Sequence, residues 1–335
     1  MYAIYSSIYF GPYASKTLRI TSVALNSILV LLKLAVLVNK SRILKTLTKL
    51  RIFGSPNLRH RKHMQSSLRK YAILACGLCV FIPVSIAMTS TVMILRNVEK
   101  YRFTLELAGQ KSTSFNLVSI FVFIGHQIMF MVHFFMFPGL VMTLLSFVYL
   151  SYVKTFQRHL EAMRFGLLSH FSREEISKAL MLFTVAQKIR SDIEKSVSFI
   201  AFFAYVLTFG NILFLVCGYA SDYLADEKSI REVYFISIFT WTLGWFVVLT
   251  TCGSRGIESE TFIKDMTQEV ISKNFDMKGE GHKRLIYMNL LNSFSGCEVR
   301  FTGWGMFEVD KKLFLTVLGV LVTYGVLFAS ELRKT

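Results

Sequence analysis

The sequence is poor in charge, in proline and in paired cysteine. Charged residues make up 18% of it, against roughly 25% in soluble proteins, and there are only four prolines in 335 residues. The five cysteines are an odd number, and most fall in or beside apolar runs, which argues against a disulfide framework. Hydrophobic residues fill the chain instead, 53% in all with 31 phenylalanines. This balance argues against two soluble domains and predicts an all-α, polytopic helical membrane protein.

Catalytic and metal-binding motifs are also missing. The sequence contains no HExxH, GxSxG or P-loop pattern, and Gly303-x-Gly305 is too short to indicate nucleotide binding. Cys76-x-x-Cys79 lies inside an apolar run and has no second ligand pair at metal spacing, so a structural role is favoured. We therefore expect no enzyme activity, no metal site and no cofactor.

Acidic residues are scarce where basic residues gather. The chain has 38 Lys and Arg against 21 Asp and Glu, a formal charge of +17 that would suit a nucleic-acid partner. Residues 39–70, however, hold ten of these bases and no acid. Short loops of this composition stay on the cytoplasmic side of a membrane, where they contact anionic lipid. The placement of the charge thus predicts a cytoplasmic loop and no nucleic-acid binding.

Six apolar stretches are long enough to cross a bilayer. They cover residues 18–38, 71–95, 115–152, 197–219, 233–252 and 313–330. The third is too long for one upright helix, so we expect a tilted helix, bent at Pro138-Gly139, that continues past the membrane. Residues 1–17 are expected to be the remnant of a seventh span, or the start of a sequence whose first span is missing.

The charges of the connecting segments fix the predicted orientation. Because successive spans alternate in direction, the inside segments are 39–70, 153–196 and 253–312, and the outside segments are 96–114, 220–232 and the C-terminus. Ser172-Arg173-Glu174-Glu175 is a capping box, which predicts that a cytosolic helix begins there and runs directly into the fourth span. The last inside segment is expected to be helical on both sides of Gly279-Glu280-Gly281.

Hydroxyl-bearing residues of the last span fall on one side of a helix. Thr316, Thr323 and Ser330 are spaced by seven residues, and Gly319 and Tyr324 lie close to the same stripe. Such a stripe either faces water or packs tightly on another helix, and the pattern alone leaves both open. In the first case the pore-lining residues are Thr316, Gly319, Thr323, Tyr324, Leu327 and Ser330, with Leu327 able to close the path by dewetting.

The stretch that leads into this span carries a spaced motif, F-T-x-x-G-x-F-x-x-D-x-x-L, followed by T-Y. Its residues are Phe301, Thr302, Gly305, Phe307, Asp310, Leu313, Thr323 and Tyr324. The motif resembles the C-terminal signature of the insect gustatory receptors, which belong to the seven-transmembrane insect chemoreceptors. The chain departs from that signature at Ser330-Glu331, where the family has Gln-Phe.

The resemblance implies both a fold and a function. Receptors of this family are inverted relative to G-protein-coupled receptors, and the last helices of four subunits surround a cation path. By this likeness we expect a tastant-gated, non-selective cation channel for contact chemosensation, in the plasma membrane of sensory neurons. The expected partners are a small-molecule tastant, membrane lipid and other gustatory receptors in a homo- or hetero-tetramer. Residues 1–252 form the predicted ligand-binding bundle, with cytosolic helix extensions at 153–196, and 253–335 the predicted anchor and pore-lining helix.

Polar and aromatic residues in the outer half of the predicted bundle are candidates for a ligand pocket. They are His126, Gln127, His133, Tyr205, Asn211 and Trp241. For any single one of them, hydrogen bonding between helices is the simpler explanation, so the prediction concerns the group.

Two other functional classes were weighed against the channel. A heptahelical G-protein-coupled chemoreceptor would be a monomer whose C-terminus lies inside the cell. A transporter is disfavoured, because the sequence shows no internal repeat and no pair of interrupted spans.

Overall fold

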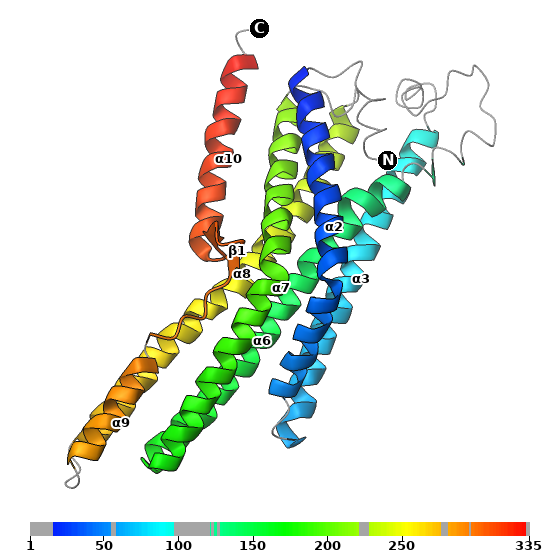
Figure 1. Cartoon of the computed structure of the whole chain (residues 1–335). Coiled ribbons are helices and arrows are strands. Elements are labelled where there is room, and N and C mark those ends of the chain that lie inside the picture. Colours follow the sequence, from blue (N-terminus) through cyan, green and yellow to red (C-terminus); the bar gives the residue numbers. More distant parts are fainter. Residues whose placement is uncertain are drawn as a thin grey trace.

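The fold is a bundle of long helices with one short hairpin (Figure 1). The computed structural model describes residues 16–54, 58–96, 121, 124–125, 128–220, 228–275, 281–294 and 296–332, and the statements below concern those residues. Its elements are α2 (Lys16–Phe53), α3 (Leu58–Arg96), the π-helical turn η2 (Val132–Met136), α6 (Phe137–Ser169), α7 (Arg173–Ala220), α8 (Lys228–Phe275), α9 (Gly281–Phe294), β1 (Thr302–Gly303), β2 (Phe307–Glu308) and α10 (Lys311–Leu332).

Five helices are long and apolar enough to cross a membrane, which confirms the all-α, multi-pass prediction. They lie within Val23–Phe53, Ser66–Thr89, Ile128–Ser169, Arg173–Val216 and Phe235–Lys273. These correspond to the first five predicted spans, and the sixth falls within the 22-residue helix α10. Residues 1–15, on which the predicted remnant of a further span largely rests, are outside the described part of the chain.

The helices are longer than a bilayer is thick. Both α7 and α8 have 48 residues, about 72 Å at 1.5 Å per residue, so each continues well past ~30 Å of hydrocarbon. As predicted, the helix that begins at Arg173 runs into the fourth span without a break. Helix α8 likewise passes uninterrupted through the predicted domain boundary at 252, so the predicted bundle and the predicted anchor share one helix.

Three helix connections gather at one end of the molecule. Figure 1 shows that the ends joining α2 to α3, α6 to α7 and α8 to α9 lie together, far from the C-terminal end of α10. These are the three segments that the charge pattern assigns to the inside. The alternation of spans that was predicted from charge therefore agrees with the path of the chain.

Local chemistry accounts for the helix boundaries. The backbone N–H of Glu175 donates to Ser172 Oγ over 3.3 Å, so the predicted N-cap forms. Pro138 stands in the first turn of α6, where no backbone donor is needed, and the wider turn η2 directly precedes it. The predicted bend at Pro138-Gly139 thus coincides with a change of helix type.

The core follows α6, which packs against both α7 and α8. Its largest fully buried side chains include Tyr149, Tyr152 and Phe156. Outward-facing residues of α2 and α3 are apolar and exposed, among them Val38 and Phe81, as expected for surfaces that meet lipid tails. The one interior charge of the first span, Lys33, lies 5.4 Å from the centroid of the Phe137 ring and so faces α6.

Candidate functional site

The hydroxyl stripe of α10 points away from its own subunit. Helix α10 packs on α7 and α8 through residues such as Phe314 and Leu321, the latter only 9% exposed. On the other side Thr316, Gly319 and Thr323 are exposed, and Tyr324 is 48% exposed. The predicted stripe is therefore a continuous outer face of the helix in a single chain. The side chains of Leu327 and Ser330 belong to α10 but lie outside the described residues.

The threonines of this face bond to their own helix. Thr316 Oγ1 donates to the carbonyl of Lys312 over 3.0 Å, and Thr323 Oγ1 donates to that of Gly319 over 2.9 Å. Each hydroxyl hydrogen is thus satisfied within α10, while the oxygen lone pairs stay available on the exposed face. The face presents acceptors, which suit hydrated cations better than anions. These bonds leave the alternatives of pore lining and helix packing open.

The motif before α10 forms a β-hairpin that was not predicted from the sequence. Strands β1 and β2 pair antiparallel, Thr302 with Glu308 and Gly303 with Phe307. The turn between them has positive φ at Trp304 and Gly305, 52° and 70°. Glycine adopts this conformation without strain, which explains why the motif has Gly at position 305.

Other motif residues hold the hairpin in place. The ring of Phe301 stacks on Tyr149 at 4.2 Å between centroids, and the N–H and hydroxyl of Thr302 donate to the carboxylate of Glu194 over 2.8 and 2.9 Å. Asp310 Oδ1 accepts the N–H of Leu313 over 2.9 Å and caps α10. The motif therefore fixes the point and direction at which the last helix begins.

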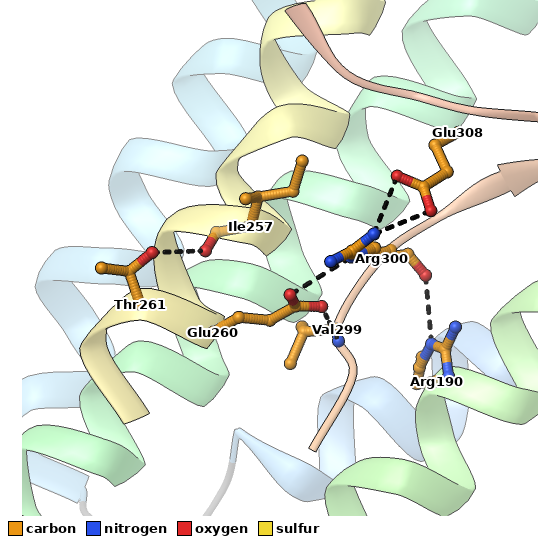
Figure 2. Close-up of polar contacts among 7 residues, drawn as sticks. All are labelled: Arg190, Ile257, Glu260, Thr261, Val299, Arg300 and Glu308. Carbon is orange, nitrogen blue, oxygen red and sulfur yellow. Dashed lines mark hydrogen bonds and ion pairs between the residues drawn. The ribbon is translucent and has the colours of Figure 1, made fainter. Parts of the chain in front are cut away.

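A charged network fastens the segment 297–301, which leads into β1, to α8 (Figure 2). Glu260, whose side chain is 9% exposed, accepts the N–H of Val299 over 2.6 Å and Nε of Arg300 over 3.2 Å. Arg300 also donates to both carboxylate oxygens of Glu308, over 2.9 and 3.1 Å, and its carbonyl accepts from Arg190. Hydrogen bonds to Glu308 and then Glu260 raise the pKa of Arg300 above its usual value, so the guanidinium stays charged.

Two glycines of α8 let the chain on either side of the hairpin approach closely. A Cβ at Gly256 would overlap the carbonyl oxygen of Val299, and a Cβ at Gly253 would overlap the side chain of Val309. A Cβ at Gly244, nearer the start of the same helix, would meet nothing within 4 Å. Only the first two glycines are therefore needed for packing.

A hollow lies between α6, α7 and α8, on the far side of the hairpin from α9. It is small and open to the surface, with about 20 Å³ free for the centre of a water-sized molecule. It is lined by ten residues: Phe134, Phe135, Pro138, Gly139, Met142, Thr208, Asn211, Trp241, Thr242 and Trp245. Two of the predicted ligand residues, Asn211 and Trp241, lie together in this lining. The described residues contain no group of three or more His, Cys, Asp or Glu that could hold a metal ion.

The remaining predicted ligand residues lie elsewhere. His133 is in η2, next to Phe134, but is not part of the lining. Tyr205 is buried in α7, three residues before the lining residue Thr208, and its hydroxyl bonds with Thr250 Oγ1 over 3.1 Å. His126 and Gln127 are outside the described residues. Trp245, which sequence reasoning missed, had no signal beyond its spacing of four residues from Trp241, one turn of α8.

Ring contacts join α8 to α10 and to the hairpin directly beside the hollow. Phe246, the residue after Trp245, lies 6.0 Å from Phe314 of α10, measured between ring centroids. Tyr205 lies 5.3 Å from Phe246 and 5.3 Å from Phe307 of the hairpin. Helix α8 thus carries Trp245, in the wall of the hollow, and next to it Phe246, which contacts the base of the last helix.

Comparison with solved structures places this arrangement among known folds. The olfactory receptor OR5 of the insect Machilis hrabei superimposes on the chain with a TM-score of 0.66 at 11% identity, over 97% of this chain and 85% of the receptor. Its complex with eugenol gives 0.65 at 10% identity, over 98% and 87%. The chain has the insect olfactory receptor fold. No protein-family model and no curated protein sequence matches it. The insect olfactory receptor fold confirms the predicted chemoreceptor architecture, whereas nothing in the comparisons supports a G-protein-coupled receptor.

Proposed function

We propose that the chain is a subunit of a ligand-gated, non-selective cation channel that serves contact chemosensation. The observation that carries the proposal is the outer face of α10, whose threonines and tyrosine are exposed on a helix that packs on its own subunit through one side only. Polar groups on such a face are unfavourable against lipid tails and favourable against water. The fold shared with an insect olfactory receptor supports this function.

The exposed face requires more than one subunit. Four copies of α10 around a common axis would turn their hydroxyl faces toward a central aqueous path, with the subunits being this chain alone or this chain with related receptors. Each copy would keep Leu321 and Phe314 against its own α7 and α8. In this proposal the tetramer lies in the plasma membrane of sensory neurons, and the cytosolic ends of its helices hold the four subunits together.

The ligand, a tastant, enters the hollow and opens the path. A ligand acts on the equilibrium between closed and open states only through its different affinity for the two, and a few kcal/mol are enough for a usable switch. Trp245 in the wall of the hollow is followed in α8 by Phe246, whose ring contacts Phe314 of α10. In this proposal a displacement of α8 beside the ligand is passed through Phe246 to the base of the pore helix.

Changing the stripe is expected to change permeation and to leave assembly intact. Thr323→Leu removes an exposed oxygen, and Tyr324→Ala removes an exposed phenol, so both should alter single-channel conductance or the Na⁺/K⁺ permeability ratio about twofold or more. Leu321→Ala, on the opposite side of α10, is the matched control and should lower stability without altering selectivity. Patch-clamp recording measures the first effect and size-exclusion chromatography the assembly. Variants with altered assembly and normal permeation would show that the stripe is a packing surface.

The orientation of the C-terminus separates the channel from a G-protein-coupled receptor. An epitope tag added after Thr335 is expected to stain on intact, unpermeabilised cells. The basic segment 39–70 is expected to lie in the cytoplasm, and the alternation of spans then puts the C-terminus outside the cell. A tag inserted at Ser55, between α2 and α3, should stain only after permeabilisation. The reverse pattern would exclude the proposed topology.

A further inference from the structure

Two adjacent lysines begin α10, and their surroundings differ. Lys311 Nζ lies 3.6 Å from a carboxylate oxygen of Glu258 in α8, which offsets its charge. Lys312 is exposed, and within the part of the chain that the structure describes no carboxylate pairs with it. The first turn of α10 therefore presents one positive charge that its own subunit does not neutralise.

The acidic residues next to Lys312 in the sequence are used elsewhere. Asp310 is only 8% exposed, and its Oδ1 accepts the N–H of Leu313 over 2.9 Å. Glu308 accepts two hydrogen bonds from Arg300, over 2.9 and 3.1 Å. Both carboxylates hold the hairpin and the helix cap in place, so they are not free to turn toward the lysine.

Lys312 extends the hydroxyl stripe of α10 by one turn toward the hairpin. Thr316 comes four residues later, on the same side of the helix, and its Oγ1 donates to the carbonyl of Lys312 over 3.0 Å. Thr323 lies about three turns after Lys312 and falls on that side too. Lys311 is rotated by about 100° from Lys312 and points toward Glu258 instead.

In the predicted orientation this lysine lies at the inner end of the stripe. Helix α10 has 22 residues, about 33 Å, which is close to the thickness of the hydrocarbon core. Figure 1 shows its first turn beside the hairpin and its other end at the C-terminus. Because the C-terminus is expected outside the cell, the first turn is expected at the cytosolic surface of the membrane.

We propose that Lys312 of each subunit contributes to a ring of positive charge at the cytosolic mouth of the channel, and that this ring makes the channel pass inward current more readily than outward current. The inference rests on the proposed function, because the ring exists only where four copies of α10 line one path. Four unit charges about 10 Å from a cation lower the local concentration of monovalent cations about twofold at physiological salt. Cations that start from the outer mouth, about 33 Å away along the helix, are screened from the ring.

Single-channel recording from the Lys312→Gln variant tests the ring. Inside-out patches are taken from cells that express the full-length chain, with the same salt solution on both sides. Openings are spontaneous or evoked by fructose, caffeine and citrate together, since the current through an open channel does not depend on what opened it. At equal positive and negative voltages, outward current should be about half of inward current in the unmodified protein. It should be nearly equal to inward current in Lys312→Gln and exceed it in Lys312→Glu.

Lys311→Gln is the matched control, because it removes the same charge one position earlier and on another side of α10. Its ratio of outward to inward current should stay close to that of the unmodified protein. An about tenfold dilution of the salt lengthens the screening distance, so it should deepen the asymmetry in the unmodified protein and in Lys311→Gln but not in Lys312→Gln.

A cysteine at position 312 tests the sign of the charge at one site. In Lys312→Cys, a cytosolic aminoethyl methanethiosulfonate attaches a positive group and should restore the asymmetry. The sulfonatoethyl reagent attaches a negative group and should reverse it. The unmodified protein, treated with both reagents, controls for its five native cysteines.

The outcomes distinguish this inference from the proposed function. Cation currents with the same asymmetry in the unmodified protein and in Lys312→Gln would overturn the ring and leave the channel standing, and Lys312 would then be a contact for lipid phosphates. Outward current larger than inward current in the unmodified protein, made symmetric by Lys312→Gln, would place the lysine at the outer mouth and also overturn the inference. No current from any variant, with the chain present at the cell surface, would reject the channel and the ring together.

Discussion

Replacing Gly256 by alanine is expected to destabilise the protein by about 2–4 kcal/mol, far more than one methyl group usually does. The added Cβ would overlap the backbone carbonyl of Val299, which cannot rotate away as a side chain could. Either the segment 297–301 lifts from α8, or α8 bends. Each of these changes displaces the start of α10. The apparent melting temperature of the detergent-solubilised protein, measured by fluorescence-detected size exclusion, should fall by several degrees.

Gly244→Ala is the matched control in the same helix. A Cβ at Gly244 meets open space, so alanine there should be neutral or stabilising by up to about 1 kcal/mol through its higher helix propensity. Equal melting temperatures for Gly256→Ala and Gly244→Ala would mean that the segment around Val299 does not lie on α8 as described.

Glu260→Leu is expected to have an effect of similar size, about 2–3 kcal/mol. The substitution leaves the buried N–H of Val299 without its charged acceptor, and hydrogen bonds to charged groups contribute about 1.5–3 kcal/mol. It also removes one of the two carboxylates that hold Arg300. Glu260→Gln keeps an oxygen that can accept the N–H of Val299, so its stability should lie between that of Glu260→Leu and that of the unmodified protein. The same thermal assay measures both variants, and a ligand-evoked current measures the consequence for opening.

Glu258→Leu provides the control for loss of an acidic residue. Glu258 lies two residues earlier in α8 and pairs with Lys311 at 3.6 Å, with both side chains largely exposed. Exposed ion pairs contribute little to stability, so this variant should melt close to the unmodified protein. A larger loss at Glu258 than at Glu260 would contradict the role assigned to the buried network.

The sequence predicted the parts of the fold that local pattern determines. Long apolar runs gave the spans, and Ser172 gave the start of α7. These features depend on composition within one segment or on neighbours three residues apart. The break between α2 and α3 likewise follows from Gly54 and Pro56.

The contacts between distant segments could not be predicted in this way. Glu260 and Arg300 are 40 residues apart, and nothing in their neighbourhoods shows that one pairs with the other. The hairpin was missed because its strands have two residues each, too short for an alternating pattern. Of the predicted ligand residues, Asn211 and Trp241 line one hollow, whereas the hydroxyl of Tyr205 bonds with Thr250. Their positions in the sequence do not show which of them share a cavity.

Helix α10 is fixed at its first turn. The cap by Asp310 and the hairpin restrain that turn, whereas Tyr324, further along the helix, is 48% exposed within the part of the chain that the structure describes. A rod of 22 residues is about 33 Å long, so a tilt of about 5° at its base sweeps the far tip through about 3 Å. In the proposed tetramer the hairpin would act as a pivot, and a displacement too small to disturb the packed core would be enough to dilate an opening at the outer surface of the membrane.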